Sequence, residues 1–200
     1  ALAGMALVFP GVMLMQMISA GAMGGGISSA IARALGAGRR AEADALVLHA
    51  VVINVLLGAI FSALLLVFGR PLYRLMGGEG ASLEAALVYS DIIFAGSTLL
   101  WVMNGLASVI RGTGNMWVPA LVICVGTVLL VPLSPLLIFG LGSIPAFGIA
   151  GGGIALVLFY VGGTAVLGWY VLSGRNLVHI RLAPLRWPLM REILRVGAVA

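Results

Sequence analysis

The chain has 200 residues, of which 62% are hydrophobic and only 8% are charged, and its mean hydropathy is +1.20. Soluble domains carry roughly 25% charged residues, so this composition excludes a water-soluble globule. The formal net charge is +5, but every basic residue is an arginine placed between apolar runs; because the arginines form no single basic face, nucleic acid is excluded as a partner.

Three long stretches contain almost no ionisable side chain. Residues 1–32 and 112–174 have no acidic, basic or histidine side chain, and residues 45–69 have only His49. A hydrocarbon core about 30 Å thick needs roughly 20 apolar residues of helix to cross it. The sequence therefore predicts an all-α fold, a polytopic bundle of transmembrane helices in contact with membrane lipid.

Five crossings are expected in chain order. The first covers about residues 2–30, with Pro10 as a kink, and the second covers about 45–68. The third covers about 86–110 and the fourth about 116–139. The fifth follows a turn at 140–148 and ends near residue 172.

The arginines indicate the orientation of these crossings. Five crossings place the connections alternately on two sides, and one side receives every arginine except Arg70 and Arg74. Because positively charged loops stay in the cytoplasm, the arginine-rich side is expected to be cytoplasmic. The first crossing then runs inward, so we expect an odd number of further helices, most simply one, before Ala1. The chain is then a fragment of a bacterial inner-membrane protein.

Three regions follow from this organisation. Residues 1–174 are the five-helix transmembrane part, and residues 175–190 are a cytoplasmic or interfacial connector. Residues 191–200 are expected to start the next transmembrane helix. Pro184 and Pro188 interrupt the connector, and Trp187 suits the depth of the lipid headgroups.

Enzymatic machinery does not appear in the sequence pattern. No nucleophile–base pair, paired carboxylates or metal-ligand spacing occurs, and Cys124 is the single cysteine. The glycines at 21–26 resemble a dinucleotide-binding pattern but follow no strand, so we expect close helix packing through Gly21 and Gly25. The chain is therefore expected to be neither an enzyme nor a metal or cofactor protein, which leaves transport or a passive structural role.

Polar side chains within the crossings are candidates for a transport pathway. Asp91 is the one acidic residue inside a crossing; it either faces a cavity and exchanges protons, or lies in water near the outer surface. Asn104 is on the same predicted helix, about 140° away around its axis. Gln16, Asn54 and Thr164 lie mid-span and either hydrogen-bond to neighbouring helices or contact substrate.

Two tight turns on the arginine-rich side are candidate hinges. One contains Gly36 and Gly38, and the other contains Arg111, Gly112 and Gly114. The second turn is either a simple cytoplasmic turn or a latch whose glycines absorb a change in the backbone.

Pro132 and Pro135 remove two backbone donors from the fourth crossing. A break in this helix is therefore expected, with the freed carbonyls satisfied by neighbours or by water. Such a break either lines a transport path or packs against adjacent helices.

Four short motifs occur in order along almost the whole chain, at residues 32–38, 111–119, 135–140 and 148–151. With them the chain resembles the multidrug and toxic compound extrusion (MATE) family of secondary transporters. The resemblance implies twelve helices in two six-helix lobes around a central cavity. This chain would then hold helices two to six, the connector between the lobes and the start of helix seven.

The resemblance also implies a function. Family members exchange small, often cationic, drugs or metabolites for H⁺ or Na⁺ by alternating access, so we expect a monomeric antiporter with a coupling ion and no other cofactor. Many members place an Asn and an Asp on the fifth helix where this chain has Leu130 and Ser134, so the usual first-lobe cation site is absent or rebuilt. Coupling then depends on Asp91 or on the second lobe. The alternative is a flippase for lipid-linked or polysaccharide precursors, whose more basic cavity would need arginines inside the crossings.

Overall fold

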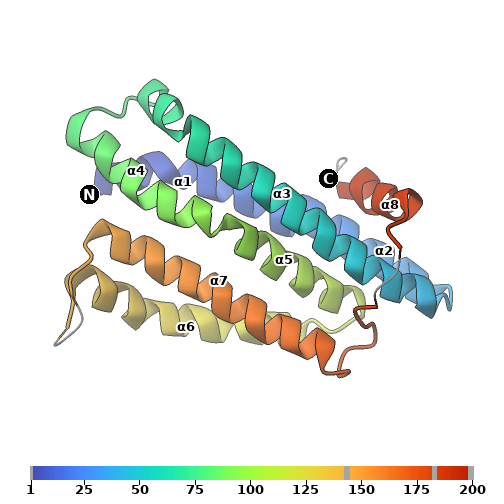
Figure 1. The fold of residues 1–200 in the computed structure, drawn as a ribbon. Helices are drawn as coiled ribbons and strands as arrows, with labels where there is room; N and C mark the ends of the chain where they lie inside the picture. Colours follow the sequence, from blue (N-terminus) through green and yellow to red (C-terminus); the bar gives the residue numbers. More distant parts are fainter. Residues whose placement is uncertain (1, 142–144, 182–183, 198–200) are drawn as a thin grey trace.

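The computed structural model describes residues 2–141, 145–181 and 184–197, and these fold into one bundle of long helices (Figure 1). The elements in chain order are α1 (Leu2–Gln16), the π-helix η1 (Met17–Met23), α2 (Gly24–Gly36), α3 (Arg40–Leu75), α4 (Gly80–Ala95), α5 (Ser97–Gly112), α6 (Trp117–Phe139), α7 (Ile149–Leu172) and α8 (Trp187–Gly197). The all-α prediction is confirmed.

The chain passes along the bundle five times. The first pass is the continuous run α1–η1–α2, and α3, α6 and α7 are each long and apolar enough to cross a membrane. The remaining pass is the pair α4 and α5, which meet at an angle of 46°. The third crossing was expected as one helix, and the structure instead divides it at Gly96.

The arginine-bearing connections lie at one end of the bundle, at the right of Figure 1. Hydrogen bonds join them there. The Thr113 hydroxyl after α5 donates to Asn176 Oδ1 after α7 (3.2 Å), and the backbone N–H of His179 donates to the Asp44 carboxylate near the start of α3 (2.9 Å). The sequence predicted that these connections lie on the same side of the membrane, and the structure places them together.

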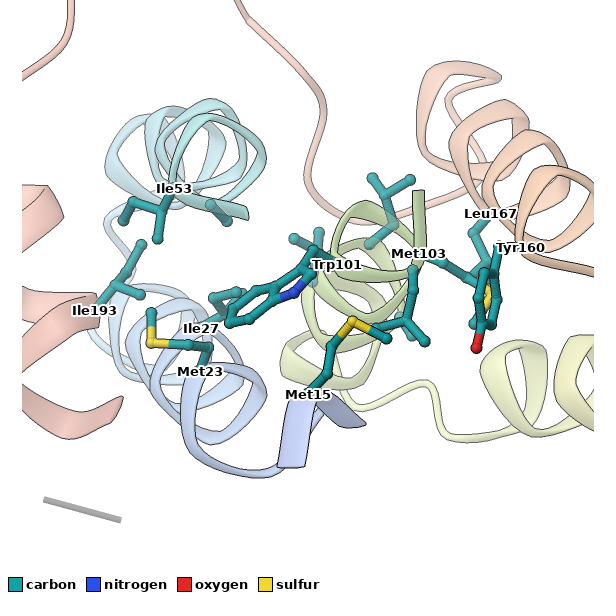
Figure 2. Packing of buried hydrophobic residues seen from close by; sticks show 14 of the residues in the cluster. Met15, Met23, Ile27, Ile53, Trp101, Met103, Tyr160, Leu167 and Ile193 are labelled. Carbon is teal, nitrogen blue, oxygen red and sulfur yellow. The ribbon is translucent and has the colours of Figure 1, made fainter. Parts of the chain in front are cut away.

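Helix α5 occupies the centre of the bundle, and its side chains pack on α2, α3 and α7. Figure 2 shows Trp101 of α5 reaching towards Ile27 of α2, whereas Met103 points to Tyr160 of α7. In contrast, Pro119 is the one buried residue of α6, and Val128 is 70% exposed. Apolar side chains on this outer surface match lipid rather than water.

The bend at Gly96 has a clear hydrogen-bonding basis. It frees the Phe94 carbonyl from its usual partner in a straight helix, and the Ser62 hydroxyl of α3 donates to that carbonyl instead. The Ser97 hydroxyl donates in return to the Gly58 carbonyl (3.3 Å). A broken helix is stable in an apolar environment when neighbouring groups satisfy its backbone in this way.

The helix break expected at Pro132 and Pro135 is wrong, because α6 continues as a helix through both prolines. Each proline removes one donor and bends the helix, but the bonds on the other sides of the helix can persist. Since the two residues are three positions apart, they lie on nearly the same face of α6.

The expected packing through Gly21 and Gly25 is also wrong. A Cβ added at either position would meet nothing within 4 Å. The close contacts are instead at Gly24, where a Cβ would lie 2.7 Å from Ser108 Oγ, and at Gly26, where it would lie 2.5 Å from the Ile193 carbonyl oxygen. The glycines do bring helices together, but through two other faces: Gly24 lies against α5 and Gly26 lies against α8.

The connector is followed by α8, which begins at Trp187, four residues earlier than expected. Ile193 and Gly197 are buried against α2 and η1, whereas Arg191 and Arg195 are exposed. This short amphipathic helix packs on η1 and α2, from Met23 and Gly26 to Arg33. Continuation into a new transmembrane helix stays a prediction, since residues 198–200 lie outside the described ranges.

Candidate functional site

A polar cluster lies inside the bundle between η1 and α5. Asn104, Ser108 and Arg111 are spaced by four and three residues and share one face of α5, and Gln16 and Ser19 lie opposite them. Ser19 and Ser108 are fully buried, and Asn104 is 4% exposed. Polar groups buried this deeply need partners, and the cluster supplies them internally.

The hydrogen bonds of the cluster form a chain towards the arginine-rich end. Asn104 Nδ2 donates to Ser19 Oγ (2.8 Å) and to Gln16 Oε1 (3.4 Å). Ser108 Oγ donates to the Asn104 carbonyl (2.7 Å), and the Arg111 guanidinium donates to Ser108 Oγ (2.8 Å). The cluster therefore connects the middle of the bundle with a half-buried cation near its end.

The π-helix η1 is the second unusual feature at this site. Ser19 lies within it, and the Ser19 hydroxyl donates to the Gln16 carbonyl (3.4 Å). A π-helical turn holds one residue more than an α-helical turn and often occurs at functional sites. Because amide and hydroxyl groups both donate and accept, such a cluster can exchange partners without exposing a charge to lipid.

The cluster cannot itself carry a proton at neutral pH, since it contains no carboxylate or imidazole. Gln16 is half-buried at its edge, next to an exposed surface that includes Met13, Met17 and Gly21. Gln16 is therefore the member best placed to contact a molecule outside the bundle.

Asp91 lies elsewhere. It is exposed on α4, on the same side of that helix as Glu84, Val88 and Ala95, whereas Asn104 faces the bundle interior. The two predicted pathway residues on this crossing are thus not brought together. In the part of the chain that the structure describes, no element covers the Asp91 face, and its proposed role in coupling stays a prediction.

Thr164 and Asn54 are both engaged in the packing of the helices. The Thr164 hydroxyl of α7 donates to the Leu99 carbonyl of α5 (3.0 Å). Asn54 is fully buried, and its Nδ2 donates to the Ala50 carbonyl within α3 (2.8 Å), where it lies against Gly105. A contact between substrate and Thr164 is not tested by this geometry.

The predicted hinge glycines occupy two kinds of position. Gly38 and Gly114 have φ values of +73° and +87°, a conformation that favours glycine and lets each turn reverse tightly. Gly36 and Gly112 are the last residues of α2 and α5. A Cβ on Gly112 would lie 2.9 Å from the Ser28 carbonyl oxygen, so Gly112 allows α5 to approach α2. Movement at these turns stays a prediction.

The connector is held to α3 by two buried side chains that the sequence did not single out as binding groups. Asp44, 7% exposed, accepts from the His179 N–H (2.9 Å) and pairs with Arg181 Nε (3.2 Å). His49 is fully buried; its Nδ1 lies 2.7 Å from the Ala45 carbonyl, and its Nε2 accepts from the Arg186 N–H (2.7 Å).

These two bonds define which nitrogen of the His49 ring carries the hydrogen. Nδ1 must carry the hydrogen because it faces a carbonyl, and Nε2 must be bare because it faces an N–H. Asp44 and His49 are ionisable residues at the arginine-rich end of a long apolar run. Their presence there could have predicted a contact with another segment. Among the described residues, no group of three or more His, Cys, Asp or Glu side chains could hold a metal ion.

Five apolar passes, a buried polar cluster and a positively charged end define the class. The chain is a polytopic integral membrane protein, with polar groups in its interior that a simple membrane anchor would not need.

The profile of the MatE family matches residues 1–136, and the chain belongs to this family. It is 29% identical to a FAD transporter of Shewanella oneidensis over 179 residues. This alignment covers 90% of this chain and 39% of the relative. It is 30% identical over 174 residues to a probable multidrug resistance protein NorM of Thermotoga maritima, covering 86% and 37%. The family resemblance seen in the sequence is confirmed.

Solved structures of the family match the fold equally well in two states. An inward-facing conformation of a multidrug resistance MATE family transporter has a TM-score of 0.89 at 30% identity, over 98% of this chain and 44% of that one. An outward-facing conformation has a TM-score of 0.88 at 31% identity, over 98% and 43%. The chain thus spans less than half the length of these relatives, and the relatives named here are transporters rather than enzymes.

Proposed function

We propose that this chain is the first-lobe part of a secondary transporter that exports small, often cationic, drugs or metabolites in exchange for H⁺ or Na⁺. Family membership supports transport, and the equal match to inward- and outward-facing relatives supports alternating access. A lobe that keeps its internal packing in both states moves as one body. The change between states then takes place between this lobe and the second one.

The docked connector supports the same mechanism. Asn176, His179 and Arg186 are each hydrogen-bonded to this lobe, so the connector moves with it at these three positions. A free linker would let the two lobes separate in many ways. A linker fixed along α3 restricts the second lobe to a defined rocking motion.

The substrate class is supported by a groove between α6 and α7. Its volume is about 300 Å³, and its lining is apolar, including Leu129, Leu133 and Phe159. No charged side chain lines it, so it suits the flat apolar part of an amphipathic molecule rather than a phosphate-bearing one.

Asp91 is the proposed coupling residue. A carboxylate on the surface of a membrane helix is costly unless another part of the protein or water covers it, and protonation removes that cost. Glu84 on the same face already has a partner, Arg70 (3.2 Å), and so provides a matched control.

The test uses the full-length protein in proteoliposomes with an imposed H⁺ or Na⁺ gradient. We expect gradient-driven movement of ethidium, a planar organic cation, and its loss in Asp91→Asn but not in Glu84→Gln. Unchanged transport by Asp91→Asn would show that coupling lies in another part of the protein. Transport of FAD but not ethidium would show that the substrate is a dinucleotide and not a drug-like cation. Transport of neither compound would refute the proposal.

A further inference from the structure

A basic cleft lies between α2 and α8, at the arginine-rich end of the bundle. Its volume is about 1010 Å³, and its lining includes Arg33, Trp187, Arg191, Glu192 and Arg195. Three arginines and one glutamate give the cleft an excess of positive charge. The transport mechanism proposed above uses none of these side chains.

The charges in the cleft are only partly compensated. Arg33 pairs with Glu192 across the two helices (3.0 Å). Within the described ranges, neither Arg191 nor Arg195 has a carboxylate within 4.0 Å. These two arginines are one turn apart on the same exposed face of α8, and like charges at this spacing destabilise a helix. An anion between them would remove that repulsion.

The position of α8 identifies the anion. Its opposite face is buried, with Ile193 fully covered and Gly197 against η1 and α2, so Arg191 and Arg195 lie on the exposed side of α8, where they line the cleft with Arg33. Trp187, 66% exposed at the start of α8, is the side chain that membrane proteins place at headgroup depth. Because this end carries the arginines, the cleft opens towards the cytoplasmic leaflet, where anionic lipids attract basic segments.

We propose that the cleft between α2 and α8 binds the phosphate of an anionic phospholipid headgroup from the cytoplasmic leaflet, through Arg191 and Arg195. Arginine suits this role because its planar guanidinium donates two parallel hydrogen bonds to phosphate oxygens. Arg33 and its partner Glu192 line the cleft beside these two arginines. The bound lipid ties α8 to the membrane surface.

The test measures phosphatidylglycerol binding to the full-length protein in detergent by native mass spectrometry. The variant Arg191→Gln/Arg195→Gln should bind about 30-fold more weakly, as expected for two arginines near an anionic headgroup. The control Arg39→Gln/Arg40→Gln removes two charges from the same end of the bundle but outside the cleft, and should bind normally. Phosphatidylcholine should bind weakly to all three proteins.

Three results would overturn the proposal. Equal weakening in both double variants would mean that general surface charge attracts the lipid. No loss in Arg191→Gln/Arg195→Gln would mean that the cleft is covered by another part of the protein. Competition by inorganic phosphate at a concentration comparable to that of the lipid would show a site for free phosphate instead. None of these measurements depends on transport, so they are independent of the proposed function.

Discussion

Gly26→Ala is the substitution that best tests how α8 docks on the bundle. The backbones of α2 and α8 meet at Gly26, where an added Cβ would lie 2.5 Å from the Ile193 carbonyl oxygen and 3.1 Å from the Gly197 nitrogen. Ordinary contact begins near 3.4 Å, so α8 would have to withdraw by about 1 Å. Both obstacles are backbone atoms, which cannot rotate aside as a flexible side chain would.

Gly25→Ala provides the matched control, since a Cβ there would meet nothing within 4 Å. Both substitutions gain up to about 1 kcal/mol of helix propensity, so the difference between them isolates the packing term. Overpacking typically costs about 1–3 kcal/mol. We therefore expect the free energy of opening the α2–α8 contact to be about 2 kcal/mol lower in Gly26→Ala than in Gly25→Ala.

Hydrogen exchange of the α8 amides in the full-length protein measures this opening. A difference of about 2 kcal/mol corresponds to roughly 30-fold faster exchange in Gly26→Ala. Equal protection of α8 in the two variants would refute the docking described here. Faster exchange in Gly25→Ala alone would instead support the helix packing through Gly21 and Gly25 that the sequence predicted.

Three further substitutions test the interior contacts. Asn104→Leu removes the donor to Ser19 from a buried cluster and should lower stability by about 1–3 kcal/mol, seen as a lower thermal midpoint in detergent. Asp44→Asn removes the buried α3 carboxylate that holds the connector and should increase proteolysis after Arg181, with the fold of the bundle unchanged. His49→Phe keeps a ring but loses the acceptor of the Arg186 N–H, and should speed exchange of that amide specifically.

The number of passes and their orientation could be predicted because lipid imposes strong requirements. A crossing needs a long run without charge, and arginine marks the ends of such runs. The rotation of each helix about its axis could not be predicted in the same way. Residues 112–174 are apolar on every side, so no amphipathic pattern distinguishes the face towards α5 from the face towards lipid.

The glycines at 21–26 show how a rotation error arises. Gly21 and Gly25 have the spacing of a helix contact, yet the contacts are made by Gly24 and Gly26. Gly21 lies within η1, and the extra residue of a π-helical turn rotates everything after it relative to an ideal α-helix, by about 100°. Nothing in the residues 17–23 alone predicts that turn, because its polar contacts come from Asn104 on a distant helix.

Only part of the polar cluster could be predicted from the sequence. Asn104 and Gln16 stood out as mid-span amides, and the structure joins them (3.4 Å). Ser19 and Ser108 did not stand out, because serine is common in membrane helices and bonds readily to its own backbone. The spacing of Asn104, Ser108 and Arg111 places all three on one face of a helix. That spacing could have predicted a polar cluster extending from Asn104 to Arg111.

The relative strength of two contacts bears on where the proposed rocking motion would pivot. The connector is held by two buried side chains, the Asp44 carboxylate and the His49 imidazole, and leaving a buried hydrogen-bonding group without its partner typically costs about 1–3 kcal/mol. The ion pair of α8 joins Arg33 and Glu192, whose side chains are 48% and 32% exposed, and such pairs contribute about 0–1 kcal/mol. In the proposed rocking motion we therefore expect the Arg33–Glu192 pair to break before the connector contacts do. We propose a pivot just after Arg186, at the start of α8.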